Sequence, residues 1–296
     1  MTHYDQASGL RTTYGRATKE VKVITVTSGK GGVGKTSVSL NMAVALSQKG
    51  HRVFVLDADL GLANVDVMLG LRATKNLSDV IAGSCNLDDI LLEGPQQIKI
   101  LPATSGMQSM VNVSSTQQAS LIHAFNDLKT PCDVLIVDTA AGISNTVLNF
   151  SCASQHILLV VSEDPSSITD AYALMKLLNR QYGISSFKVA VNMARDVASG
   201  IELFMKLRKV ADSFLNVALE MVANIPFDES LRKSVRRQRS VVDMLPDAPS
   251  TLSYKKLATH VEEWPTPSAP SGYLSFFVES FFRYQNTQQK EGLICE

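Results

Sequence analysis

The sequence is short of the features that mark several specialised classes of protein. Its 28 basic and 28 acidic side chains balance over 296 residues, so bulk charge gives no strong indication of direct nucleic-acid binding. The 4 cysteines show no C-x-x-C or Cys/His spacing, which disfavours zinc and a disulfide framework. No apolar run nears the roughly 20 residues that span a bilayer, and the chain starts without the apolar core of a secretory signal. We therefore expect a cytoplasmic protein that at most lies against the inner face of the cell membrane.

What the sequence does contain is an alternation of short β-branched runs and longer amphipathic stretches. Apolar strands separated by helices are typical of a parallel sheet that is covered on both faces. The pattern predicts one α/β domain over residues 21–264, with a doubly wound, mainly parallel sheet and helices on both faces. The expected strands are residues 21–27, 53–56, 134–137, 157–161, 188–191 and 217–225.

Three segments lie outside this domain. Residues 1–20 are polar and are expected to form a flexible segment that reaches a partner, and residues 265–272 form a stiff, proline-rich linker by composition. Residues 273–296 are expected to form an amphipathic helix and tail. Two positions for this helix stay open, a lipid surface and a groove of the domain or of a partner subunit. The apolar face consists of Leu274, Phe277, Val278, Phe281 and Phe282.

A glycine-rich loop follows the first expected strand. Residues 29–36 match the pattern G-x-x-x-x-G-K-[ST], and an expected helix follows them. Glycines let backbone N–H groups turn around phosphate oxygens, and the positive end of the helix dipole adds to the attraction. Lys35 is expected to reach the β- and γ-phosphates, and Thr36 to ligate Mg²⁺. The predicted phosphate-binding residues are Gly29, Gly31, Gly32, Val33, Gly34, Lys35, Thr36 and Ser37.

Carboxylates end two of the later strands. Asp57 and Asp59 follow one apolar run, and Asp138 ends another, as a Walker B carboxylate does. Asp138 is expected to hold Mg²⁺ through water, and Gly142 to face the γ-phosphate. A single aspartate at a strand end is commonly a helix cap, but three such elements in this chain order favour a nucleotide site.

Lys30 narrows the class of nucleotide site. The run K-G-G-V-G-K-T at residues 30–36 resembles the signature of the deviant Walker A family, which includes MinD, ParA, the nitrogenase iron protein and arsenical-pump ATPases. The resemblance implies a SIMIBI-type P-loop NTPase fold, ATP and Mg²⁺ as cofactors, and a homodimer that forms with ATP. It also implies that Lys30 reaches the partner's nucleotide, that Asp57 holds Mg²⁺ indirectly, and that Asp59 orients the attacking water. Hydrolysis is then expected to be slow and dependent on the dimer.

The same resemblance places the base and the second nucleoside near the later strands. Asn192 matches the asparagine that reads adenine, and Glu163 matches the segment that approaches the partner's nucleoside. The loop that encloses the base would be Pro226, Phe227 and Asp228.

The flanking motifs resemble one branch of the family, the flagellar-number regulators called FlhG or FleN. The N-terminal motif is D-Q-A-x-x-L-R, and the runs at 57–66, 101–106 and 168–172 are also similar. This implies two partners, a GTPase of the FlhF type and a transcription activator of the FleQ or FlrA type, and a place in the cytoplasm or at the cell pole. The residues implied in stimulating the GTPase are Asp5, Gln6, Ala7, Leu10 and Arg11.

Two other readings of the sequence remain. An iron–sulfur carrier is poorly supported, because the cysteines are not placed to bridge a cluster. A ParA-type ATPase for partitioning DNA or cargo would need a surface that grips DNA. The candidate surface is one predicted helical face with five cations. Most such faces are merely solvated, and the others bind a partner protein, anionic lipid or DNA. These cations are Arg232, Lys233, Arg236, Arg237 and Arg239.

Overall fold

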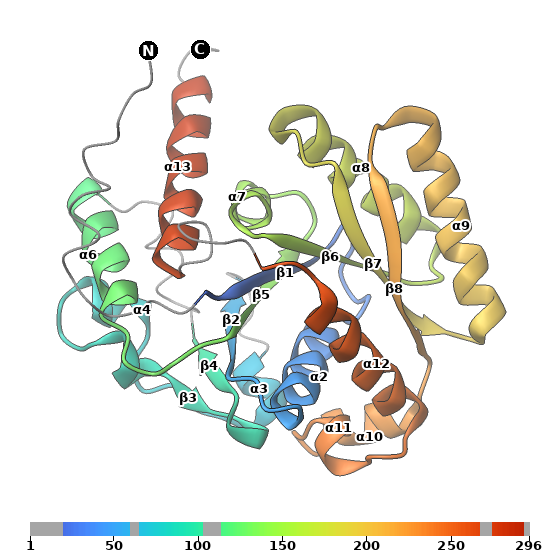
Figure 1. Ribbon diagram of the computed structural model, residues 1–296, viewed down its shortest axis with the longest axis horizontal. Coiled ribbons are helices and arrows are strands. Elements are labelled where there is room, and N and C mark those ends of the chain that lie inside the picture. The colour runs from blue at the N-terminus through green and yellow to red at the C-terminus, as the bar shows by residue number, and fades with distance from the viewer. Residues whose placement is uncertain (1–19, 60–64, 103–113, 267–273, 293–296) are drawn as a thin grey trace.

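One mixed sheet of eight strands forms the centre of the protein in the computed structural model, which describes residues 20–59, 65–102, 114–266 and 274–292 (Figure 1). The strand order is β3-β4-β2-β5-β1-β6-β7-β8, and every pairing except β3 with β4 is parallel. The predicted doubly wound α/β class is therefore confirmed. The strands are β1 (Lys22–Ser28), β2 (Val53–Ala58), β3 (Leu92–Glu93), β4 (Lys99–Leu101), β5 (Val134–Ala141), β6 (His156–Val161), β7 (Ser186–Ala194) and β8 (Ala218–Pro226).

Successive apolar side chains of a strand point to opposite faces of the sheet and so belong to different hydrophobic cores. Ile24 and Val26 of β1 face a core that includes side chains of the helix that follows the glycine-rich loop, whereas Val23 faces the opposite core. The helices on the first face are α2 (Lys35–Gln48), α3 (Val65–Leu69), α10 (Glu229–Arg236), α11 (Val241–Met244) and α12 (Pro249–Glu263). Those on the other are α4 (Leu77–Ile81), α6 (Ser115–Asn126), α7 (Asn145–Ala153), α8 (Pro165–Tyr182), α9 (Val197–Phe214) and α13 (Leu274–Gly292). Of two short 3₁₀ helices, η1 (Leu87–Ile90) lies on this second face, and η2 (Pro95–Gln97) contacts α2.

The last helix packs on its own chain. In Figure 1, α13 stands between α6 and α7, and it contacts both helices. The ring of Phe281 stacks on Phe150 of α7 with centroids 4.4 Å apart, and Phe277 lies on the same ring at 6.1 Å. All five residues of the predicted apolar face are buried. The helix runs from Leu274 to Gly292, and its buried side chains share one core with side chains of β1, β2 and β5.

None of the helices within the described ranges is long and apolar enough to cross a membrane.

Candidate phosphate-binding site

The glycine-rich loop joins β1 to α2 at the carboxyl edge of the sheet. Gly32 and Gly34 have φ values of +79° and +86°, which other residues rarely adopt. A Cβ on Gly29 would lie 2.1 Å from the backbone carbonyl carbon of Asp170 in α8, so only glycine fits where the loop passes that helix. The first turn of α2, which contains Lys35, Thr36 and Ser37, therefore starts from a backbone that glycines alone can form.

Lys35 lies among carboxylates. Its side chain is largely buried, and burial lowers the pKa of its ammonium group, while the charges of Asp138 and Asp59 raise it. A buried ammonium beside two carboxylates can neutralise phosphate charge in a site from which water is excluded.

The two strand-end carboxylates are neighbours in the sheet. Parallel pairing of β2 with β5 puts Asp57 opposite Asp138. Asp138 is fully buried, its Oδ1 accepts a hydrogen bond of 2.8 Å from Ser39, and its Oδ2 has no partner among the described residues. Burial raises the pKa of Asp138 to about 7, with hydrogen bonds from Thr36 and Ser39 acting against that rise. An unsatisfied buried carboxylate oxygen is a place where a hydrated cation fits.

Asp57 ties the end of β2 to the next helix. Its Oδ2 accepts a hydrogen bond of 3.1 Å from the backbone N–H of Val65, at the start of α3, and its Oδ1 accepts one of 3.2 Å from Asp59. The start of α3 is thus hydrogen-bonded to Asp57, the carboxylate that is expected to hold Mg²⁺ indirectly. Gly142, at φ +95°, follows β5 and donates its N–H to the carbonyl of Ser28 at the end of the neighbouring strand β1.

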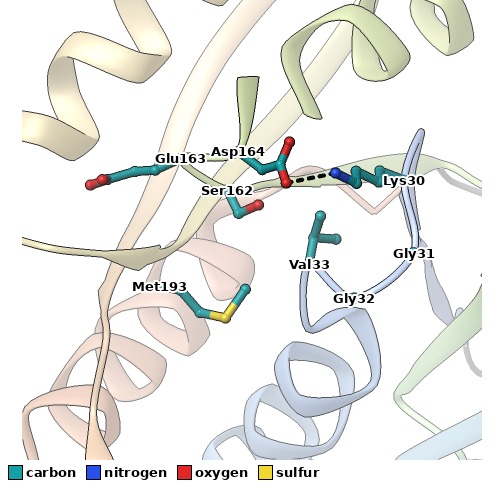
Figure 2. A pocket seen from close by; sticks show the side chains of 8 residues that line it. All are labelled: Lys30, Gly31, Gly32, Val33, Ser162, Glu163, Asp164 and Met193. Atoms are coloured by element: carbon teal, nitrogen blue, oxygen red, sulfur yellow. Dashed lines mark ion pairs between the residues drawn. The ribbon is translucent and has the colours of Figure 1, made fainter. Parts of the chain in front are cut away.

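Lys30 lines a pocket beside the loop and is held within its own chain. The pocket has a volume of about 280 Å³ (Figure 2). The Lys30 ammonium lies 2.6 Å from Asp164 Oδ2 and 2.6 Å from Ser166 Oγ. The hydrogen bond from Lys30, together with those from Ser166, lowers the pKa of Asp164 to about 2. The residues that line the pocket are Lys30, Gly31, Gly32, Val33, Ser162, Glu163, Asp164 and Met193.

Asn192, in β7, is hydrogen-bonded to the glycine-rich loop. It is 1% exposed, and its Nδ2 donates a hydrogen bond of 2.8 Å to the carbonyl of Val33. Its Oδ1 has no partner in the described part of the chain, so it can accept an N–H from a bound base. Glu163, at the pocket, instead accepts hydrogen bonds from the backbone N–H and the Nε of Arg195, at 2.9 and 2.7 Å.

The predicted base loop lies at the end of β8, next to β7. The backbone N–H of Phe227 donates to Ala194 at 2.8 Å, and its ring is 54% exposed. Asp228 begins α10 by accepting from Ser230, and it also accepts from Ser250. Pro226 pairs with Ala194, which places the loop two residues from Asn192 along β7.

Some sequence predictions cannot be placed, and some contacts were not foreseen. Asp5, Gln6, Ala7, Leu10 and Arg11 lie outside the described residues. The contacts that Lys30 makes with Asp164 and Ser166 were not predicted. The run Asp164-Pro165 is a helix-start signal, and Asp164 does cap α8, but no local pattern says that Lys30 would meet it.

Comparisons with known proteins agree on one family. The family model for ParA, which is described as "NUBPL iron-transfer P-loop NTPase", matches residues 19–262 of this chain. The Antiactivator FleN of Pseudomonas aeruginosa is 54% identical over 267 residues, 90% of this chain and 95% of that protein. The Flagellum site-determining protein YlxH of Helicobacter pylori is 33% identical over 80% of each chain. A chain of the MinC:MinD cell division protein complex of Aquifex aeolicus superposes with a TM-score of 0.65 at 25% identity, covering 84% of this chain and 99% of its own.

The chain belongs to the ParA/MinD family of P-loop NTPases. The resemblance that the sequence carries is therefore confirmed. Two of the four cysteines, Cys132 and Cys152, are core side chains, and burial raises the pKa of both thiols, whereas Cys85 is only partly buried. Buried neutral thiols of this kind, at Cys132 and Cys152, are poorly suited to hold a cluster.

Proposed function

We propose that this chain is an ATP-dependent dimerising ATPase that regulates the number and placement of flagella. In this proposal it acts as an antiactivator of a FleQ/FlrA-type transcription activator and stimulates an FlhF-type GTPase. The observation that carries the proposal is the 54% identity to Antiactivator FleN over 95% of that protein. The printed name of the H. pylori relative, a flagellum site-determining protein, supports the same role.

The site fits ATP with Mg²⁺ on several structural grounds. Two buried oxygens, Asp138 Oδ2 and Asn192 Oδ1, have no hydrogen-bond partner among the described residues. A hydrated Mg²⁺ would give a partner to the carboxylate oxygen, and the adenine amine would give one to the amide oxygen. Thr36 and Asp138 would hold Mg²⁺ with Asp57 behind them, and Asn192 would accept from the exocyclic amine of adenine. Mg²⁺, when bound, neutralises charge on the β- and γ-phosphates. Lys35 adds a fixed positive charge at the same place.

Hydrolysis in this site is a transfer of the γ-phosphoryl group to water. The water oxygen forms a bond to the γ-phosphorus, and the bond from that phosphorus to the β–γ bridging oxygen breaks, which leaves ADP and inorganic phosphate. Asp59 orients the water, and Lys35 stabilises the charge that develops on the leaving oxygen. Lys30 of the partner subunit supplies a further positive charge, so hydrolysis is slow in the monomer.

A matched pair of loop variants tests the nucleotide site. Lys35→Ala is expected to abolish ATP binding, because it removes the buried ammonium beside Asp138 and Asp59. Lys30→Ala is expected to retain ATP binding, because its ammonium contacts Asp164 and Ser166 rather than the centre of the loop. Equilibrium binding of a fluorescent ATP analogue distinguishes them. Equal loss of affinity in both variants would show that Lys30 acts on its own nucleotide.

Purified partners test the regulatory part of the proposal. Added to an FlhF-type GTPase, the full chain is expected to raise GTP hydrolysis, and the chain without residues 1–20 is expected to lose this effect while its own ATPase activity persists. Added to a FleQ/FlrA-type activator with ATP, the full chain is expected to lower activator-dependent transcription in vitro. A full chain that binds ATP but changes neither reaction would refute the regulatory role.

A further inference from the structure

The exposed side of α10 carries cations that the fold does not use. Arg232 pairs with Glu229 and Arg239 pairs with Asp243, at 2.9 and 2.8 Å. The other three cations, Lys233, Arg236 and Arg237, are exposed, and their side chains have no ion pair or hydrogen bond in the described ranges of the chain. We call these three the basic surface.

The predicted helical face of five cations is wrong in one respect. The helix ends at Arg236, Arg237 is its C-cap, and Gln238 has a φ of +54°. The chain turns away there, so Arg239 belongs to the next turn rather than to the helix. The basic surface is therefore compact, and it ends at a turn whose backbone is held in an uncommon conformation.

Hydrogen bonds connect that turn to α3 and to α2, the two helices that contact the phosphate site. Gln238 Nε2 donates a hydrogen bond of 3.1 Å to the carbonyl of Val67 in α3. Asn41 of α2 accepts hydrogen bonds at its Oδ1 from Ser240 Oγ and the Val241 N–H, at 2.7 and 3.0 Å. Asn41 also donates to the carbonyl of Ser37, in the first turn of α2, at 2.8 Å.

A continuous set of bonds thus joins the basic surface to the phosphate site. On the α3 side it runs from Gln238 to α3 and from the Val65 N–H to Asp57. On the α2 side it runs through Asn41 to Ser37, next to Thr36. A shift of α2 or α3 when nucleotide changes would move the turn that carries Arg237.

Apolar side chains stand at both ends of the basic surface. Phe227 precedes α10 and lies under the Arg232 guanidinium, 5.9 Å from its ring centroid. Val67, which holds Gln238 through its carbonyl, is 61% exposed. Cations between two exposed apolar groups match a protein segment that carries both carboxylates and apolar anchors.

We propose that α10 and Arg237 form a docking surface for an acidic segment of a partner protein with apolar anchors, and that its affinity depends on the nucleotide in the phosphate site. A nucleic-acid backbone offers no apolar anchors for the exposed side chains of Phe227 and Val67, so these residues favour a protein segment. Leu231 packs against the core, so α10 presents no apolar face that could enter a lipid surface.

Fluorescence anisotropy with the full chain tests the surface directly. The probe is a labelled 16-residue peptide of Asp, Glu, Leu and Phe, and its control has Asn and Gln in place of the acids. Lys233→Glu/Arg236→Glu/Arg237→Glu is expected to weaken binding about tenfold or more, because three attractions become repulsions. The matched control, Arg180→Glu/Lys209→Glu/Lys256→Glu, reverses three exposed cations elsewhere and is expected to bind as the unaltered chain does.

Several outcomes overturn the proposal. They are equal binding by the unaltered chain and the triple variant, equal binding of the acidic and amide peptides, and no peptide binding at low salt. Binding of a 20-base-pair duplex or of anionic vesicles that the triple variant loses, without peptide binding, would instead assign the surface to those ligands.

The nucleotide dependence rests on the proposed function, and a second variant separates the two. In an Asp59→Ala background, peptide affinity is expected to differ severalfold between ATP and ADP, and Gln238→Ala, which breaks the bond to α3, is expected to reduce this difference. Binding of both nucleotides is measured on the same samples, and a thermal melt checks that Gln238→Ala folds. No nucleotide binding refutes the proposed function. Normal nucleotide binding with no difference in peptide affinity overturns the coupling alone.

Discussion

Two lysines of one loop have different surroundings. Lys35 is largely buried beside Asp138 and Asp59, whereas Lys30 reaches sideways to Asp164 and Ser166 on α8. The sequence motif predicts both lysines, but it does not predict that Lys30 of a single chain is already engaged. To act on a partner's nucleotide, Lys30 must first leave Asp164. Under the proposed function, this ion pair would therefore favour the monomer until the γ-phosphate of the partner's nucleotide is available.

Asp164→Asn tests this hold on Lys30. Asparagine keeps an oxygen that can cap α8 through the Ser166 N–H, but it removes the negative charge that faces Lys30. We expect dimerisation at a lower protein concentration with ATP, and unchanged affinity for ATP in the monomer. Sedimentation equilibrium over a concentration series measures the first, and fluorescent-ATP titration the second. A dimer weaker than that of the unaltered chain would show that Asp164 supports the dimer instead.

His156 gives the fold a pH dependence where the chain leaves α12. Its Nε2 lies 2.8 Å from the carbonyl oxygen of Pro265, and its ring packs against Trp264. Burial lowers the pKa of His156, and the charges of Lys22 and Lys188 act in the same direction. The unfolded chain therefore takes up a proton first as the pH falls.

The contribution of His156 to stability is accordingly complete above the ordinary histidine pKa of about 6.5 and declines as the pH drops from there to the lower folded-state value. His156→Gln keeps a side-chain donor without a titration. Urea unfolding of both proteins between pH 7.5 and 5 is expected to show a flatter pH dependence for the variant. Parallel pH profiles for the two proteins would contradict this assignment.

Among the elements, α13 shows most clearly what a sequence reveals and what it leaves open. Its apolar face is evident from spacing alone, but the surface it meets is assembled from α6, α7 and the sheet, far away in the chain. Burial of four large side chains contributes on the order of 6–12 kcal/mol, so the helix must be covered in the free chain. The structure covers it with its own domain.

A pair of phenylalanine variants measures how firmly α13 is docked. Phe277 is buried against Phe150, whereas Phe276 is only partly buried and has the Arg283 guanidinium over its ring. We expect Phe277→Ala to lower the free energy of unfolding by about 3–5 kcal/mol, and Phe276→Ala to change it far less. Urea unfolding gives both values. Equal, small effects would show that the helix leaves its groove readily.

Release of α13 to a lipid surface is a separate matter that vesicle pelleting decides. If the ATP dimer frees the helix, pelleting is expected to require ATP and to vanish in Phe277→Glu. Since Arg283 and Lys290 are the main cations of the segment, anionic lipid is expected to matter little. Equal pelleting with ADP and ATP would rule out control by nucleotide.

The strands were predictable from the sequence to different extents. The other six strands were predicted because each contains a continuous apolar run, and even β8, which lies at the edge of the sheet and is partly exposed, ends in such a run. β3 and β4 were missed, since they have only two and three residues and carry no periodic signal. The turn at Gln238 was also missed, because the left-handed residue that ends a helix is usually glycine or asparagine, and a glutamine gives no such signal.

Over the whole molecule, the candidate site follows from the topology. The loop after β1, the carboxylates ending β2 and β5, and Asn192 in β7 meet at the carboxyl edge of the sheet, where open α/β sheets bind ligands. Chain order and strand-end residues were enough to predict that meeting. The pairing of Lys30 with α8 depends on tertiary packing, and so it could be seen only in the folded chain.

ATP-driven dimerisation through Lys30 is the central claim for the molecule. Each charge-assisted contact to a phosphate is worth about 1.5–3 kcal/mol, and two lysines making two contacts each could exceed the ~5.5 kcal/mol that turns a 1:99 equilibrium into 99:1. Each lysine gives up its contacts with Asp164 and Ser166, so the net gain is smaller. ADP lacks the γ-phosphate that Lys30 would contact, so it is expected not to compensate for the lost contacts and not to drive dimerisation.

Sedimentation velocity of the full-length Asp59→Ala protein tests this claim most directly, because that variant should bind ATP without hydrolysing it. At tens of micromolar protein, with saturating nucleotide and Mg²⁺, we expect a dimer with ATP, a monomer with ADP, and a monomer with ATP once Lys30→Ala is added. A monomer with saturating ATP, or a dimer that survives Lys30→Ala, would contradict the account.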